Sequence, residues 1–287
     1  MTITRSAPAK INLALDVVGK KDNGYHLVEM IMQTITLQDT VTVTAATETV
    51  LYCNRADVPT GTANICLKAW QLMKERYQLP DGLRVEIHKE IPVAAGLAGG
   101  STDGAAAMLA INEEFRLGLS LTELKRLGAR LGADVPFCLQ KGTALATGIG
   151  DELQVLPACP PLFVVAVNAG FPVNTADVYR NLVWHQLPSH PNIKEMRKAL
   201  YRQDVEALLQ NAENVLEQSA FALFPALRET KERLGSLGIF PIMSGSGGTM
   251  LGLTPDREKA EFALTRLRAD FPFAGIFQTQ DQQRNGA

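Results

Sequence analysis

Short runs of apolar and β-branched residues, broken by Gly, Asp or Asn, dominate the first 45 positions of the chain. Such runs are typical of β-strands, and they predict strands over Ile11–Val18, Val28–Leu37 and Val41–Ala45. A further strand is predicted over Leu83–His88, where apolar and polar side chains alternate as on the two faces of a sheet. The first part of the chain is therefore expected to build a sheet.

Helical spacing appears next. Asn64–Tyr77 places its apolar residues on one face, and Asp103–Phe115 and Leu121–Leu131 show the same period of three to four residues. Ser120 and Glu123 have the spacing of a capping box, which marks the start of the last of these segments. The pattern therefore predicts three helices, one before the strand over residues 83–88 and two after it.

The three prolines in Leu156–Pro161 favour extended, poorly paired backbone and indicate a boundary between domains. We therefore predict an N-terminal domain over residues 1–157 and a C-terminal domain over residues 158–287. The elements expected in the second domain are a buried strand at Leu162–Asn168, mostly helix over residues 176–234, a hairpin at Ile239–Leu253, a final helix, and a strand at Ala274–Thr279. This order predicts an α+β fold.

The composition is that of an ordinary globular protein, with 46% hydrophobic and 20% charged residues among 287. Lys and Arg number 28 against 30 Asp and Glu, so the net charge of −2 gives no basic field for nucleic acid or an anionic membrane. We expect a small-molecule partner, with no nucleic acid and no membrane.

The first residues lack the basic start and apolar run of a signal peptide, and no run of about 18 apolar residues occurs. The four cysteines are widely spaced and form no C-x-x-C pair. Both features predict a cytoplasmic protein with reduced thiols.

Four glycines, Gly96, Gly99, Gly100 and Gly104, surround the predicted start of a helix that follows Pro92. Glycine lets backbone N–H groups approach a ligand closely, and several N–H donors at a helix N-terminus bind a polyphosphate well. The segment lacks the lysine of a Walker A loop and is not a clean G-x-G-x-x-G. Taken alone, it predicts either a phosphate loop or a flexible turn before a helix.

Three further segments leave alternatives open. Lys10 and Asn12 alternate in an apolar strand and would face the same side; the pattern alone favours a solvated strand edge over a site that uses both. Asp134, within Gly132–Phe137, could be a positioned acid or base, although its context alone favours a helix N-cap or turn aspartate. Ser244–Thr249 alone favours a hairpin turn.

Together these segments resemble the three motifs of the GHMP superfamily, named for galactokinase, homoserine kinase, mevalonate kinase and phosphomevalonate kinase. The matching segments, in order and across nearly the whole chain, are Pro8–Leu13, Pro92–Thr102 and Met243–Gly247. Asp22–His26 and Gly132–Phe137 narrow the resemblance to the kinases of 4-diphosphocytidyl-2-C-methyl-D-erythritol. The resemblance implies a ribosomal-protein-S5-like nucleotide domain followed by a ferredoxin-like domain.

The resemblance also implies phosphorylation of the 2-hydroxyl of that cytidyl diphosphate substrate, with ATP and Mg²⁺, in the non-mevalonate isoprenoid pathway. Lys10 and Asp134 match the catalytic positions of the family: Asp134 would orient or deprotonate the hydroxyl, and Lys10 would stabilise the developing charge. Tyr25 and His26 match residues that bind cytosine, and Tyr179 is the candidate for a second stacking ring, with a core or interface tyrosine as the alternative.

The implied site residues fall into three further groups. The ATP-binding positions are Pro92, Gly96, Leu97, Ala98, Gly99, Gly100, Ser101 and Thr102. The substrate-binding positions are Asn12, Tyr25, His26, Thr175 and Tyr179. The glycine-rich third motif contributes Gly245, Ser246 and Gly247.

Three positions depart from the usual pattern of the family: Ala98 replaces glycine, Thr102 replaces serine and Gly104 replaces alanine. A Cβ at position 98 costs about 1 kcal/mol if the backbone there requires a positive φ. Thr102 keeps the hydroxyl, and Gly104 weakens the helix start.

Other functions compete with this one. Another kinase of the superfamily, acting on homoserine, a sugar or a mevalonate derivative, would not need Tyr25 and His26. A nucleotide-binding sensor of the same fold without catalytic activity would not need Lys10 and Asp134. A dinucleotide-binding oxidoreductase is excluded because the glycine segment comes late and no strand with a ribose-binding acid follows it. We expect a monomer or a weak homodimer.

Overall fold

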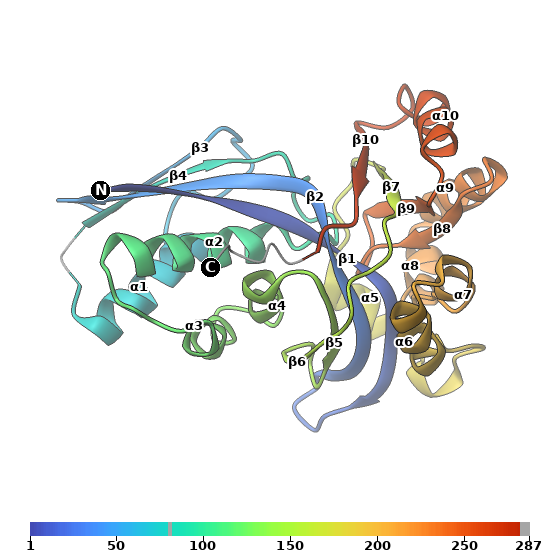
Figure 1. Cartoon of the computed structure of the whole chain (residues 1–287), viewed down its shortest axis with the longest axis horizontal. Coiled ribbons are helices and arrows are strands. Elements are labelled where there is room, and N and C mark those ends of the chain that lie inside the picture. The colour runs from blue at the N-terminus through green and yellow to red at the C-terminus, as the bar shows by residue number, and fades with distance from the viewer. Residues whose placement is uncertain (80–81, 282–287) are drawn as a thin grey trace. The chain divides into compact units, whose positions relative to one another are not determined.

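The structure is a computed structural model that describes residues 1–79 and 82–281 (Figure 1). Two compact units are present. Unit 1 comprises Met1–Ala9, Leu37–Val93 and Ala98–Gln140, and unit 2 comprises Lys10–Thr36, Ala94–Leu97 and the described residues from Lys141 onward. Two long strands, β1 (Thr2–Lys20) and β2 (His26–Ala46), contribute to both units. The units therefore do not follow a single chain boundary, and the division at 157/158 stays a prediction.

In unit 1, the C-terminal end of β2 forms a sheet with two shorter strands, β4 and β3. Residues Thr40–Ala46 of β2 run antiparallel to β4 (Gly82–His88), and β4 runs parallel to β3 (Val50–Cys53). The parallel pair is connected through α1 (Ile65–Tyr77), whose N-cap Asn64 accepts the N–H of Cys66.

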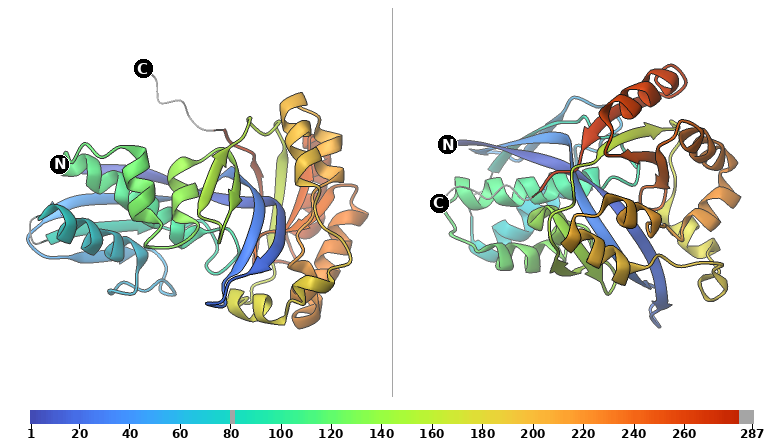
Figure 2. Two further views of the ribbon diagram at one scale, coloured as in Figure 1. Left: turned by 90° about the horizontal axis from the view of Figure 1, so that it is seen from below. Right: turned by 45° about the vertical axis from the view of Figure 1, so that its right-hand side comes forward.

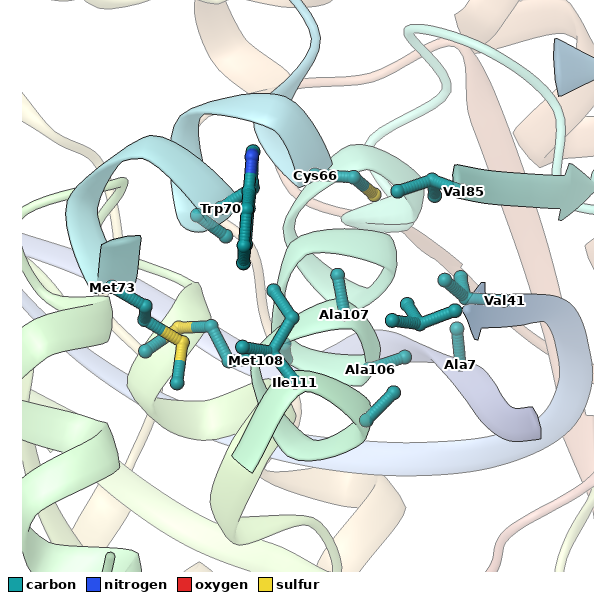
Figure 3. Packing of buried hydrophobic residues seen from close by; sticks show 14 of the residues in the cluster. Ala7, Val41, Cys66, Trp70, Met73, Val85, Ala106, Ala107, Met108 and Ile111 are labelled. Carbon is teal, nitrogen blue, oxygen red and sulfur yellow. The ribbon is translucent and has the colours of Figure 1, made fainter. Parts of the chain in front are cut away.

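Four helices cover this sheet: α1, α2 (Gly99–Glu114), α3 (Leu121–Gly128) and α4 (Val135–Gln140) (Figure 1). Figure 3 shows the centre of the core, where Trp70 and Met73 of α1 face Met108 and Ile111 of α2. Burying each such side chain contributes roughly 1.5–3 kcal/mol. Small residues in the first half of α2 let it lie close to its neighbours, and this packing fixes the position of its N-terminus.

In unit 2, Met30–Gln33 of β2 pairs with β5 (Thr143–Thr147), which pairs with β6 (Glu152–Val155). A second sheet has the order β10-β7-β9-β8, and every neighbouring pair is antiparallel. Its strands are β7 (Phe163–Asn168), β8 (Phe240–Met243), β9 (Thr249–Thr254) and β10 (Phe273–Gln278). With the chain order β-α-β-β-α-β, this is the ferredoxin-like arrangement.

The helices of unit 2 follow β7 and β9 in the chain. Two of them, α9 (Pro225–Ser236) and α10 (Arg257–Leu267), pack against the four-stranded sheet (Figure 2). The others are α5 (Thr175–Asn181), the 3-10 turn Trp184–Gln186, α6 (Ile193–Arg202), α7 (Val205–Gln210) and α8 (Glu217–Leu223). Among the described residues, none of the helices combines the length and apolar character needed to cross a bilayer.

Most predicted elements are confirmed, including the capping box of Ser120 and Glu123 and the hairpin of β8 and β9. The predicted break between residues 37 and 41 is wrong, because β2 continues through Asp39. Asp39 is buried within the strand and forms an ion pair with Lys89, a partner 50 residues away. The sequence pattern also missed β3, β5, β6 and α4, and all four cysteines are free thiols.

Candidate active site

The glycine-rich segment forms the first turn of a helix. We predicted that the helix begins at Asp103, but α2 begins at Gly99, with Ala98 as its N-cap. The N–H of Thr102 donates to the carbonyl of Ala98 at 2.9 Å. The N–H groups of the three residues in between, Gly99, Gly100 and Ser101, belong to the part of a helix that has no intrahelical acceptors. These donors, together with the helix dipole, suit an anionic group.

The two hydroxyls of this turn differ in their surroundings. The side chain of Thr102 is buried, and its hydroxyl donates to the carbonyl of Pro8 in β1 at 2.8 Å. Ser101 is half-buried. Thr102 therefore anchors the turn to the first motif, whereas the Ser101 hydroxyl is the more accessible of the two. Contact of either residue with ATP stays a prediction.

Asp134 lies close to this turn within unit 1. It is half-buried and directly precedes α4, and its carbonyl accepts the N–H of Cys138 at 3.0 Å. A Cβ placed on Gly132 would lie 4.0 Å from the Oγ of Ser101, so the Gly132–Phe137 segment runs beside the first turn of α2. The position before a helix agrees with the local N-cap interpretation, and the catalytic role of Asp134 stays a prediction.

Lys10 and Asn12 are not at a solvated edge. Both side chains are buried in β1, at 5% and 0% exposure, and the Lys10 ammonium donates to Oδ1 of Asn12 at 2.8 Å. This bond confirms that the two side chains face the same side, and the solvated-edge interpretation is wrong. The backbone N–H of Lys10 also donates to the carbonyl of Leu97 at 3.2 Å, so β1 contacts the second motif within unit 2. Burying an ammonium is costly without hydrogen bonds, and the side-chain oxygen of Asn12 accepts one from Lys10 here.

The third motif is both a hairpin turn and a partner of the second motif. The Ser244 hydroxyl donates to the carbonyl of Gly96 at 3.0 Å. Gly96 has φ of +73°, and a Cβ there would lie 2.3 Å from the carbonyl oxygen of Ser244 and 2.9 Å from that of Gly247. A Cβ on Gly245 would in turn lie 3.0 Å from the carbonyl oxygen of Gly96. These two backbone segments therefore touch only because side chains are absent.

Two residues outside the glycines hold the third motif. The hydroxyls of Thr175 and Ser246 lie 2.7 Å apart, which brings together two predicted site residues. Asn214, which sequence analysis missed, is buried and donates to the carbonyls of Met243 and Gly245 at 2.9 and 2.7 Å. A lone asparagine between helices gives no sequence signal for this role, because its partners lie about 30 residues further along the chain.

The Asp22–His26 segment forms the turn between β1 and β2. The N–H of Gly24, with φ of +88°, donates to the carbonyl of Lys21 at 2.9 Å, and Oδ1 of Asn23 accepts the N–H of Tyr25 at 3.2 Å. This turn leaves the Tyr25 ring 61% exposed.

His26 pairs with the predicted second ring. Its ring centroid lies 5.1 Å from that of Tyr179, with 31° between the planes. Burial, together with the nearby Lys20 ammonium, lowers the pKa of His26 below its ordinary value of 6.5. The imidazole is therefore neutral at pH 7, so it offers one donor and one acceptor for the edge of a base.

The strain at Ala98 gives the first prediction. Ala98 has φ of +59° and ψ of +29°, the left-handed region. Ala98→Gly should raise the free energy of unfolding by about 1 kcal/mol, because glycine adopts this conformation without a Cβ clash and is a better N-cap. Ala105→Gly, inside α2, is the contrasting substitution and should lower it by more than about 1 kcal/mol, because it loses helix propensity and also removes a buried methyl group. Urea denaturation measures both, and a loss of stability in Ala98→Gly would contradict the prediction.

The second prediction concerns His26. Because its pKa is lowered in the folded protein, protonation favours the unfolded chain, so this group costs stability as the pH falls through 6.5. An NMR titration of the imidazole should give a midpoint below 6.5, and Lys20→Gln should raise that midpoint without restoring it fully, because burial remains. Lys21→Gln serves as the control. A wild-type midpoint at or above 6.5 would refute the assignment.

Known proteins with related sequences show the family of the chain. The family model described as GHMP kinases N terminal domain matches residues 64–142, and the one described as GHMP kinases C terminal matches residues 196–272. A 4-diphosphocytidyl-2-C-methyl-D-erythritol kinase from Brevibacillus brevis is 42% identical over 273 residues, covering 93% of each chain. One from Lachnoclostridium phytofermentans is 43% identical over 264 residues, covering 91% of each.

Solved structures agree in fold. A crystal structure of 4-(cytidine 5'-diphospho)-2C-methyl-D-erythritol kinase superposes with a TM-score of 0.81 at 33% identity, covering 97% of this chain and 100% of that one. Homoserine kinase from Cytophaga hutchinsonii has a TM-score of 0.75 at 17% identity, covering 98% and 95%, and shows the fold alone. The expected GHMP kinase fold is thereby confirmed. The chain is a small-molecule kinase that belongs to the GHMP kinases, within the 4-diphosphocytidyl-2-C-methyl-D-erythritol kinase family.

Proposed function

We propose that the chain transfers the γ-phosphoryl group of ATP to the 2-hydroxyl of 4-diphosphocytidyl-2-C-methyl-D-erythritol, giving the 2-phosphate and ADP for isoprenoid precursor synthesis. The observation that carries the substrate assignment is the His26–Tyr179 ring pair beside the exposed Tyr25. Stacking rings and a neutral imidazole suit a pyrimidine base, and homoserine, galactose or mevalonate offers no base to stack. Relatives at 42–43% identity bear the name of this activity.

The ATP phosphates would bind at the first turn of α2. Phosphoryl transfer needs mainly positioning and charge neutralisation, and the N–H groups of Gly99, Gly100 and Ser101 supply both without any side-chain movement. The contact between Gly96 and the third motif holds the chain that leads into this turn. Pro92, Leu97 and Ala98 complete the proposed nucleotide segment.

The acceptor hydroxyl would be activated by Asp134 and Lys10. A carboxylate within hydrogen-bond reach orients the hydroxyl and takes its proton as the phosphorus–oxygen bond forms. The buried ammonium of Lys10, held by Asn12, would stabilise the negative charge that develops on the attacking oxygen. Thr175, hydrogen-bonded to Ser246, is proposed to contact the same substrate.

Magnesium would reach the site with ATP. Mg²⁺ is usually held by substrate phosphates and one or two carboxylates and not by a protein cage. Within the described residues no group of three or more His, Cys, Asp and Glu side chains is placed to hold a metal, so the donor set fits an ion carried by the nucleotide. When bound, the ion would neutralise phosphate charge. A cytoplasmic location and a monomeric or weakly dimeric state stay predictions.

The third prediction tests the reaction. Purified protein with ATP and Mg²⁺ should release ADP with 4-diphosphocytidyl-methylerythritol, and should show no turnover with homoserine, galactose or mevalonate, in a coupled ADP assay. Asp134→Ala should lose most turnover yet bind ATP as the wild type does, because the phosphate turn remains.

The outcomes of that assay separate the competing functions. Turnover on another alcohol would refute the substrate assignment while keeping the kinase. ATP binding without turnover on any acceptor would favour a silent nucleotide sensor. Activity of Asp134→Ala at the wild-type rate, or loss of its ATP binding, would remove Asp134 from the acceptor site.

The fourth prediction tests the base pocket. Tyr25→Ala should raise the KM for the cytidyl substrate by roughly tenfold or more, since stacking on a base contributes about 1–3 kcal/mol, and should leave the KM for ATP near the wild-type value. Tyr201→Ala, at a tyrosine on α6 that is 71% exposed, is a matched control. Equal effects of Tyr25→Ala on both KM values would exclude this role.

A further inference from the structure

A buried cluster of three charged side chains lies behind the first turn of α2, entirely within unit 1. The ammonium of Lys89, which directly follows β4, donates to a carboxylate oxygen of Asp39 and, at 2.8 Å, to one of Asp103. All three side chains are 5% exposed or less. Sequence analysis did not assign a function to any of them, because the partners lie 50 and 14 residues from Lys89.

The cluster fixes the backbone that enters the glycine-rich segment. The second carboxylate oxygen of Asp39 accepts the N–H groups of Glu90 and Ile91 at 2.6 and 2.8 Å. The Asn54 side chain accepts the N–H of Lys89 at 2.8 Å and donates to its carbonyl at 3.3 Å. Residues 89–91, just before Pro92, are thus tied to β2 and to the end of β3.

The Lys89 ammonium also lies against the first helical residue of α2. A Cβ placed on Gly99 would be 3.1 Å from the Lys89 nitrogen and 3.1 Å from Cγ2 of Ile91. Asp103, four residues after Gly99, lies on the same face of the helix one turn later. Glycine at position 99 therefore lets a buried cation sit directly behind the backbone whose N–H groups are proposed to bind phosphate.

The charges of the cluster do not balance when all three groups are ionised. Oδ1 of Asp103 is buried and has no hydrogen-bond partner in the part of the chain that the structure describes. Burial raises the pKa of Asp103 to about 7, with the Lys89 ammonium opposing the rise and the Asp39 carboxylate adding to it. Burial, together with the nearby Asp103 carboxylate, also raises the pKa of the Cys66 thiol on α1. With all three groups ionised the cluster carries a net charge of −1, because one ammonium offsets only one of the two carboxylates.

We propose that Lys89 is a positioning residue for the nucleotide, which fixes the first turn of α2 against β2 and β4 and offsets the negative charge of Asp39 and Asp103 behind the N–H groups proposed to bind the ATP phosphates. A neutral hydrogen-bond donor could perform the first task. Only a cation performs the second, because buried carboxylates left without a counter-charge in a low-dielectric interior would repel a polyphosphate through the backbone of the turn. The inference rests on the proposed function only as far as nucleotide binding, and not on the identity of the acceptor.

The test compares two substitutions that change the charge behind the turn in opposite directions. Lys89→Met removes the cation and should weaken binding of ADP at least tenfold by titration calorimetry, with a much smaller change in the KM for the acceptor. Asp103→Asn removes one carboxylate and keeps the shape of the side chain; at pH 8 it should leave ADP binding unchanged or tighten it. Lys68→Met, on the exposed side of α1, is the control for loss of one lysine.

Each outcome decides the proposal. Thermal unfolding of each variant shows whether it is folded, and if Lys89→Met does not fold, Asp103→Asn decides alone. Wild-type ADP binding by a folded Lys89→Met would refute the proposal, and tenfold weakening by Asp103→Asn at pH 8 would show that the cluster acts only as a structural brace. Wild-type ADP binding without turnover of the cytidyl substrate would refute the proposed function and leave this inference standing.

Discussion

The arrangement of the motif segments in unit 2 depends on one close contact, between Gly96 and the turn at Ser244–Gly248. Two backbone segments approach until carbonyl oxygens of one lie where a Cβ of the other would be. The Ser244 hydroxyl closes the contact on the Gly96 carbonyl, and the next residue, Leu97, accepts the N–H of Lys10. The three motifs are therefore not independent binding elements: a side chain at position 96 would displace the third motif and, through Leu97, the strand that carries Lys10.

The same contact explains the role of Asn214. A turn rich in glycine has no side chains with which to hold its own shape, so its carbonyls must be fixed from outside. Asn214 supplies two donors to this turn, and the backbone on either side of it bonds to Leu15 of β1. One buried amide thus links the strand of the first motif to the turn of the third. Removing it would leave buried carbonyls without donors, which costs more than the bonds contribute.

The sequence predicted those parts of the fold that depend on local interactions. Ser120 caps its helix as expected, because its partner Glu123 lies three residues away. The sequence pattern predicts a strand break that includes Asp39, whereas the carboxylate is buried within β2 because Lys89, 50 residues away, and the N–H groups of Glu90 and Ile91 donate to it. The burial of Lys10 was missed for a related reason, since the cost of burying a charge depends on groups that no local pattern reveals.

The candidate site follows the same division. The glycine segment is a predicted site because its composition is itself the signal, and Tyr25 and His26 are predicted through family resemblance. The start of α2 was placed four residues too late, since glycines normally weaken a helix and here form its first turn. The sequence pattern does not identify Lys89, Asp103 or Asn214, because each acts through a partner distant in sequence.

The three departures from the usual family pattern have different physical consequences. The extra methyl group of Thr102 is accommodated, because its side chain is buried and its hydroxyl is satisfied by Pro8. A Cβ at position 104 would lie 2.9 Å from Cγ1 of Ile65, so the Ile65 side chain on α1 fills the space that an alanine methyl would occupy. Ala98 has no such compensation, because its strain lies in its own backbone dihedrals and no neighbour can relieve it. Two of the departures are therefore absorbed by packing, and the third leaves a strained N-cap at the turn where the phosphates are proposed to bind.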